Sequence, residues 1–337
     1  MVVRRGVFFI KERTLAEALD IELRKFDEIV SLLESSLDSQ LQLKESLHFI
    51  YQNKSWKIRI FSKEGAFAIA NYLDRHGEAS EISLCKVLTL VEKYRITRID
   101  RSIRQAISTN SSSLILKGQQ HWVNFENVSG IFRTTQTRLE QAFENIQRTD
   151  NPMKIGEDFE DIEQALFFSF SGLEKFSIEL AASLYSKIRR EYCKRVPLVA
   201  PPILECLALA PSPSDKDVEI AMRYAANRDK KKCQVTGIER DKYNPIKLVR
   251  HHIFDKNTYR PLADDPDNII LISEEISDEF HQWNGGYDKT CTINDFIEFV
   301  ELFYSQNHEI FLRLSRLRNI LRYKLSLLRL ALPESKQ

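Results

Sequence analysis

The segment from Lys230 to Gly286 constrains the fold more than any other part of the sequence, because it contains three of the chain's seven histidines. Two short runs, KKKCQV and IKLVRHHIF, each predict a strand, and residues 254–267 form a polar loop that contains proline. The run SEEISDEFHQW then predicts a helix, with Ser273 as its N-cap and two glycines after its last turn. The predicted order is therefore strand, strand, loop, helix.

This order and its residues resemble the HNH endonucleases, whose core is a ββα-metal finger. The resemblance covers about residues 230–303. Its elements follow one another in the expected order: CQVTG from Cys233, HHI from His251, Asp267-Asn268 before an apolar run, and Phe280-His281 on the helix. The resemblance implies a metal-dependent nuclease that hydrolyses DNA phosphodiester bonds, with one strand cut per active site.

The resemblance also implies a role for each residue of the site. His252 is the general base, and His251 and His281 bind the metal ion together with phosphate oxygens and water. Asn268 is expected to hold the loop, and through it the base, by hydrogen bonds to the backbone. Adjacent strand residues point to opposite faces, so the two neighbouring histidines serve one site only if the strand ends or bulges there. Many relatives have a further histidine where this sequence has Ser277, so we expect a loosely held Mg²⁺ or Mn²⁺ ion.

Charge is sorted along the C-terminal part of the chain, although the whole chain has 49 basic and 48 acidic residues. Residues 227–260 carry a net charge of +6, residues 261–301 carry −10 and residues 302–337 carry +5. The acidic block is expected to face solvent, away from DNA. The basic residues near the predicted strands have two possible roles: they form an ordinary solvated face, or they contact the DNA backbone. They are Lys230, Lys231, Lys232, Lys247 and Arg250.

Residues 80–108 predict a helix-turn-helix. Arg98, Arg101 and Arg104 recur every three residues on its second helix and so share a face that would meet a DNA major groove. The alternative is a solvated face on an ordinary helical pair. The run SLILKGQQHWVNF after it predicts a hairpin or wing, and FSKEGAFAIANYLD before it weakly resembles parts of phage antirepressor-type proteins.

The length of 337 residues predicts more than one domain. Five of the ten prolines lie between positions 197 and 213, which predicts a linker, and no internal repeat is evident. The expected fold is mainly α and multidomain (α+β), with an N-terminal helical, winged-helix-like DNA-binding region and a C-terminal ββα-metal HNH module. The expected domains are a DNA-recognition region at 1–150, a helical middle with the linker at 151–213, and the nuclease module at 214–337, with a last helix from about 306 to 331.

Composition limits the surroundings in which the chain works. Runs of roughly 18 uncharged apolar residues are absent from the sequence, so no membrane partner is expected. Five widely spaced cysteines without a CxxC pair predict neither a disulfide framework nor a zinc knuckle, which suits the cytoplasm of a bacterial or phage-type protein. DNA is the expected partner, and the last helix offers either DNA contact or a homodimer interface. The alternative functions are a DNA-binding regulator with an inactive HNH module and a scaffold in a defence system or mobile element.

Overall fold

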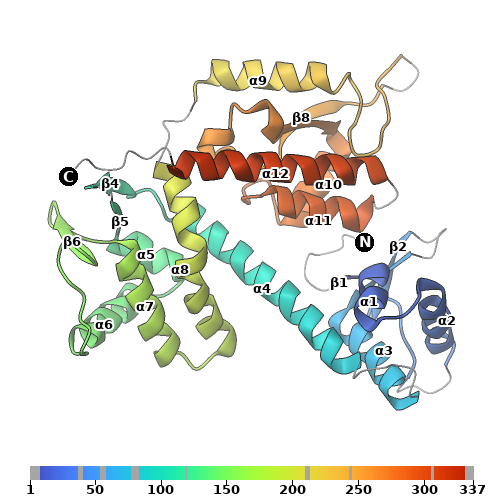
Figure 1. Ribbon diagram of the computed structural model, residues 1–337, viewed down its shortest axis with the longest axis horizontal. Coiled ribbons are helices and arrows are strands. Elements are labelled where there is room, and N and C mark those ends of the chain that lie inside the picture. Colours follow the sequence, from blue (N-terminus) through green and yellow to red (C-terminus); the bar gives the residue numbers. More distant parts are fainter. Residues whose placement is uncertain are drawn as a thin grey trace. The chain divides into compact units, whose positions relative to one another are not determined.

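The computed structural model describes residues 8–36, 41–53, 58–76, 83–118, 120–208, 213–242, 245–304 and 307–330. Within these ranges the chain is mainly helical with small sheets, which confirms the mainly α class (Figure 1). The chain forms two compact units. The first comprises Met1–Arg98, Phe280–Tyr287 and Glu298–Gln306, and the second comprises Ile99–Glu279, Asp288–Ile297 and Asn307–Gln337. This division differs from the predicted domain boundaries near residues 150 and 213.

The first unit contains a three-stranded antiparallel sheet in the order β1-β3-β2. Its elements along the chain are β1 (Phe8–Lys11), α1 (Glu12–Leu19), α2 (Leu23–Glu34), β2 (Phe49–Asn53), β3 (Ile58–Ser62) and α3 (Lys63–His76). Apolar residues at helical spacing turn one face of each helix into the core, for example Leu15, Phe26 and Ile69. The sheet and its helices therefore share one apolar core.

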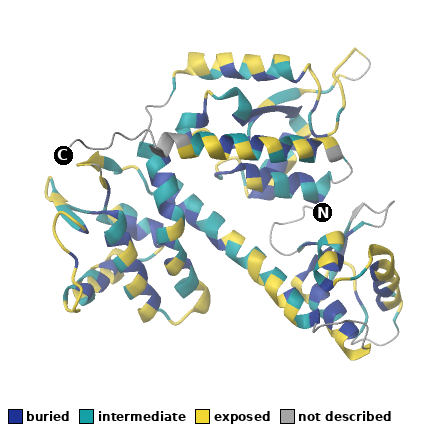
Figure 2. Ribbon diagram, viewed as in Figure 1, coloured by how far each residue is buried: buried dark blue, intermediate teal, exposed yellow. Residues whose placement is uncertain are grey.

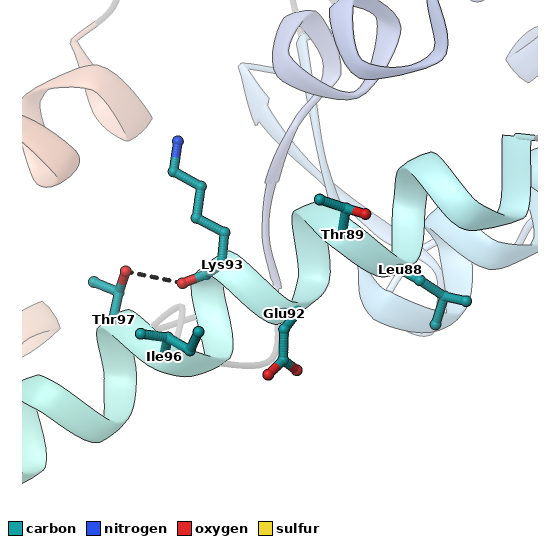
Figure 3. Close-up of a pocket in the computed structure, with 6 residues that line it drawn as sticks. All are labelled: Leu88, Thr89, Glu92, Lys93, Ile96 and Thr97. Atoms are coloured by element: carbon teal, nitrogen blue, oxygen red, sulfur yellow. Dashed lines mark hydrogen bonds between the residues drawn. The ribbon is translucent and has the colours of Figure 1, made fainter. Parts of the chain in front are cut away.

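Helix α4 (Ser83–Thr109) replaces the predicted helix-turn-helix. It is one uninterrupted helix, so the prediction of two helices joined by a turn is wrong, and residues 80–82 lie outside the described residues. The expected break at residues 95–97 contains neither glycine nor proline, so nothing there stops the helix. Figure 3 shows the Thr97 hydroxyl donating back to the carbonyl oxygen of Lys93, 3.0 Å away. The hollow drawn there is lined by side chains of α4 that point to different sides of the helix, so they form no convergent site.

The second unit begins with a four-stranded sheet in the order β4-β5-β7-β6. Its elements are β4 (Ile115–Lys117), β5 (Gln120–Asn124), α5 (Phe125–Ile131), α6 (Gln136–Gln147), β6 (Phe159–Ile162), β7 (Ala165–Phe168), α7 (Phe170–Ser183) and α8 (Lys187–Ala208). The predicted hairpin is confirmed, because β4 and β5 pair antiparallel. Buried Phe168 and Phe176 lie in the core, with ring centroids 4.9 Å apart.

Three of the five prolines predicted to form a linker lie inside helix α8. Pro197, Pro201 and Pro202 all belong to it, so the linker prediction is wrong as far as residue 208, and residues 209–212 lie outside the described residues. Each proline costs a helix about 3 kcal/mol, because it removes one backbone hydrogen bond and crowds the preceding turn. Burial of one face of α8, including Val196, offsets this cost.

The sheet domain of the first unit has a second copy in the second unit. Residues 8–76, which we call module A, and residues 120–183, which we call module B, each run strand, helix, helix, strand, strand, helix. In both modules the third strand lies between the first and the second. The turn after the first helix is left-handed in both, at Asp20 (φ 59°) and at Arg133 (φ 51°). The structure therefore corrects the expectation that the chain has no internal repeat.

Matching hydrogen bonds support the repeat. In module A the amide of Gly65 donates to the hydroxyl of Ser62 at 3.1 Å, and in module B Gly172 donates to Ser169 at 3.3 Å. A Cβ atom on either glycine would lie 2.1 or 2.2 Å from a backbone oxygen of its own module. Glycine is therefore required at the same place twice.

The rest of the second unit contains two paired strands followed by a helix. Its elements are α9 (Asp215–Arg228), β8 (Leu248–His252), β9 (Ile269–Ser273) and α12 (His308–Leu330), together with the first parts of α10 (Glu274–Asn284) and α11 (Ile293–Phe303), whose last parts belong to the first unit. Strands β8 and β9 pair antiparallel. The last helix is confirmed as α12, and the helix predicted after Ser273 is confirmed as α10, which ends before Gly285 (φ 103°).

The strand predicted at KKKCQV is wrong. In the described residues this run contributes one isolated bridge, between Lys232 and Glu239, and the strand that pairs with β8 is β9. Lys230 and Lys231 have φ values of 50° and 55°, which no strand residue adopts. The apolar run after Asn268 is fully buried and supplies the second strand instead. The structural order is therefore strand, loop, strand, helix.

Candidate active site

The two neighbouring histidines lie at the end of strand β8. His251 pairs with Ile270 and His252, the last residue of the strand, pairs with Ile269, without a bulge. Their side chains therefore leave opposite faces of the strand. His251 is buried and stacks on the ring of Phe296, with centroids 5.3 Å apart, while His252 is partly exposed.

A backbone hydrogen bond determines which nitrogen of His252 carries the proton. Its Nε2 lies 2.9 Å from the carbonyl oxygen of Ala263. A carbonyl oxygen only accepts, so Nε2 is the donor and Nδ1 keeps its lone pair in the neutral ring. Burial lowers the pKa of His252, and the bond to Ala263 opposes that shift only in part. The side chain is thus an oriented neutral imidazole with Nδ1 available to accept a proton.

Asn268 fixes the loop that carries this carbonyl group. Its side chain is fully buried and accepts a hydrogen bond from the amide of Phe254 at 2.7 Å. Its Nδ2 donates to the carbonyl oxygens of Phe254 and Leu262, each at 3.0 Å. Leu262 directly precedes Ala263, so Asn268 positions the acceptor of His252 through one peptide unit. One residue thereby holds both ends of the loop.

The loop after β8 adds a cation that sequence reasoning missed. Lys256 is exposed, and its charge contributes to the lowered pKa of His252. Asp255 fixes this turn by accepting from the amide and the hydroxyl of Thr258. An exposed cation on the loop that follows the imidazole is suited to binding an anionic substrate group. The polar composition of the loop was visible in the sequence, but the effect of Lys256 on His252 was not.

The remaining predicted ligand lies in the first compact unit. His281 is on the last turn of α10, where its ring stacks on Tyr287 with centroids 4.2 Å apart and its carbonyl oxygen accepts from Gly286 at 2.8 Å. Ser277, one turn earlier, is buried. Within the described residues, no group of three or more His, Cys, Asp or Glu side chains is arranged to hold a metal ion. His251, His252 and Asn268 all lie in the second unit, with His251 and His252 on opposite faces of β8, and His281 belongs to the other unit.

Two of the arginines predicted to contact DNA have an internal partner instead. Arg101 donates to the buried carboxylate of Asp295 at 2.8 Å, and Arg104 donates to it at 3.4 Å. Burial alone would raise the pKa of Asp295, but the charges of Arg104 and Arg101 outweigh it and lower the pKa. Asp295 also accepts from the amide and hydroxyl of Thr292, which caps α11. These contacts give Arg101 and Arg104 a structural role, and they show that this part of the acidic block does not face solvent.

The other predicted DNA contacts lie on the surface. Lys247 pairs with Glu274, and Arg250 pairs with Glu219 at 2.9 Å. The remaining ones are exposed: Arg98, Lys230, Lys231 and Lys232. Exposed ion pairs are weak, so a phosphate can compete for Lys247 and Arg250.

Helix α12 fastens the ββα segment through two of its basic residues. Arg313 donates to the buried carboxylate of Asp229 at 2.6 Å, and Asp229 also accepts from the amide of Leu271 in β9 at 3.0 Å. Lys324 donates to Asp265 and Asp267 at 2.6 and 2.9 Å, at the end of the loop. These basic side chains therefore hold the strand and the loop rather than facing outward.

Comparison with known proteins adds no family or relative: no protein-family model, curated protein or solved structure matches the chain. Among the described residues, no helix is long and apolar enough to cross a membrane.

Proposed function

We propose that the second unit is a metal-dependent nuclease that hydrolyses DNA phosphodiester bonds, with His252 as the general base. The observation that carries this proposal is the hydrogen bond from His252 to Ala263, because it leaves Nδ1 as a proton acceptor at the end of β8. The clamp made by Asn268 and the strand-loop-strand-helix order support the same assignment. The exposed cation of Lys256 suits a phosphate substrate.

The proposed step is an in-line displacement at phosphorus. Nδ1 of His252 takes a proton from a water molecule as the water oxygen bonds to phosphorus. The bond from phosphorus to the leaving sugar oxygen then breaks, and that oxygen is protonated by solvent. Because the imidazole is neutral and oriented, no reorganisation precedes the proton transfer. The proposed role of Lys256 is to stabilise the negative charge that develops on the phosphate.

A divalent ion is part of the proposal, because it would offset negative charge on the phosphate. Within the second unit, His251 is the predicted ligand, a buried imidazole on the face of β8 opposite to His252. One protein ligand suits an ion that arrives with phosphate oxygens and water, and does not suit tightly bound zinc. The role of His281 as a second ligand rests on the sequence resemblance alone.

The test is incubation of the purified chain with supercoiled DNA, with and without Mg²⁺ or Mn²⁺. We expect metal-dependent nicking that falls by about 10² to 10⁴ in the variant His252→Ala. The matched control is His76→Ala, which removes an exposed histidine of α3. Equal cleavage by the wild type and His252→Ala would refute the assignment of the base.

The same assay distinguishes the predicted metal ligand His281 from the predicted general base His252. His281→Ala should lose activity that extra Mn²⁺ partly restores, whereas no metal concentration should restore His252→Ala. If the wild type binds DNA but does not cleave it with either metal, the alternative of a DNA-binding regulator with an inactive module replaces the nuclease proposal.

A further inference from the structure

Four arginines gather around two neighbouring loops, one within module B and one directly after it. One loop joins α5 to α6, and the other, residues 184–186, joins α7 to α8 and is coloured mostly as exposed in Figure 2. The arginines are Arg133, Arg138, Arg189 and Arg190, and we call them the arginine cluster.

The first pair of the cluster surrounds one aromatic ring. The guanidinium carbons of Arg133 and Arg189 lie 5.6 and 5.1 Å from the ring centroid of buried Tyr192. Arg189 also donates to the carbonyl oxygens of Phe132 and Arg133 at 2.8 and 2.9 Å. Both head groups are therefore held next to the loop between α5 and α6.

The second pair is held by the loop between α7 and α8. Arg138 donates to the carbonyl oxygen of Ser183 at 3.4 Å, and Arg190 donates to those of Leu184 and Tyr185 at 3.2 Å each. The side chain of Tyr185 is 97% exposed. An exposed aromatic ring thus lies on the same loop as the arginine head groups.

The cluster keeps its positive charge. Within the part of the chain that the structure describes, its four arginines bond to backbone carbonyl groups and ring faces, and none of them is in an ion pair. Arginines elsewhere in the second unit, such as Arg104 and Arg313, are in ion pairs with buried carboxylates. Backbone bonds fix a guanidinium without neutralising it, so less conformational entropy is lost when it binds an anion.

Module A shows that the fold does not require this charge. In the repeat, the place of Arg133 is taken by Asp20, at the same left-handed turn. Two exposed arginines of module A, Arg13 and Arg24, each lie beside a glutamate one helical turn later, at 3.4 and 3.5 Å. The shared architecture therefore does not require an arginine at this left-handed turn.

We propose that the arginine cluster is a DNA-binding surface that contacts backbone phosphates, with Tyr185 contacting a sugar or base edge. Preordered guanidinium groups that lack carboxylate partners are suited to phosphate oxygens, and aromatic rings stack on nucleotides. This inference rests on the proposed function, since it assigns the surface that holds the DNA. It also replaces α4 as the site of recognition.

The experiment measures binding of a labelled DNA duplex to the full-length chain with the substitution His252→Ala, in EDTA, by fluorescence anisotropy at several salt concentrations. The test variant adds Arg133→Ala and Arg138→Ala, two exposed members of the cluster. The matched control adds Arg13→Ala and Arg24→Ala in module A. We expect at least tenfold weaker binding by the test variant only. The slope of the logarithm of its binding constant against the logarithm of the salt concentration should be smaller in magnitude by about 1.8. Each lost phosphate contact reduces this slope by about 0.9.

A second pair of variants distinguishes a loss of positive charge from a disturbance of the local structure. Changing Arg133 and Arg138 to lysine should retain most of the binding, and changing both to glutamate should abolish it. Equal binding by the wild type and the alanine variant, or equal losses in the lysine and glutamate variants, would overturn the proposal. Cleavage plays no part in the assay, so a chain that binds DNA through the cluster but never cuts it refutes only the nuclease proposal.

Discussion

Replacing Asn268 with alanine should release the loop between β8 and β9. The buried side chain makes three hydrogen bonds to the backbone of Phe254 and Leu262. At about 1 kcal/mol for each bond, the local loss is about 3 kcal/mol, and buried backbone groups left without partners add to it. Since 1.36 kcal/mol corresponds to a factor of ten, amide protection in residues 253–263 should fall by about 150-fold.

Hydrogen exchange followed by mass spectrometry measures this effect directly. The matched control is Asn257→Ala in the same loop, because Asn257 is exposed and its backbone amide makes the bond to Asp255. Protection of the 253–263 peptide should be unchanged in the control and reduced in Asn268→Ala. A reduction of less than tenfold would show that the loop is held by other contacts and that Asn268 does not position the acceptor of His252.

Three further predictions concern the modules and the packing of β9. Burial would raise the pKa of Asp158, but its hydrogen bonds from Lys175, the Lys154 amide and Ser171 together outweigh burial and lower the pKa, so Asp158 stabilises the fold above about pH 4. The loss of thermal stability in Asp158→Asn should therefore be full at pH 7 and shrink as the pH falls below about 4. Asp229→Asn should lower the free energy of unfolding by about 3 kcal/mol in urea titration, since it weakens a buried network of two arginines and a β9 amide. Arg59→Leu, which copies Leu166 of module B, should cost about 3 kcal/mol by the same titration, because it leaves the partly buried carboxylates of Glu12 and Glu34 without their buried cation.

The sequence predicts the C-terminal elements best where the signals are local. Ser273 precedes α10 and accepts from the amide of Ile276 at 3.4 Å, and the glycine after Asn284 is left-handed. Capping and helix termination depend on neighbouring residues, so they can be read from a short segment. The position of Asn268 between the loop and an apolar run also predicts its contact with the backbone, although not which carbonyl groups it bonds.

Contacts between distant segments could not be predicted in this way. Asp295 reads as one more residue of an acidic block, and its role depends on Arg101 and Arg104, which lie 194 and 191 residues away. The regular spacing of those arginines suggested a groove-binding face because periodicity shows which residues share a face but not what covers it. The linker prediction at the prolines of α8 was wrong for the same reason. Prolines disfavour a helix locally, and only the burial of α8 against the rest of the unit offsets their cost.

The repeat is not evident from the sequence, because the two modules share backbone features and not a repeated pattern of residues. Asp20 and Arg133 are 113 residues apart, whereas Ser62 and Ser169 are 107 apart, so no fixed period exists. What the modules share is a left-handed turn, a serine cap and a glycine that backbone atoms leave no room to replace. Residues outside these constraints were free to diverge, and they did so in charge: module A buries the guanidinium of Arg59 among carboxylates, whereas at the matching position module B has Leu166, and its left-handed turn carries Arg133 where module A has Asp20. The shared backbone therefore fixes the turn and the glycine, and leaves the charge at these positions open to a separate role in each module.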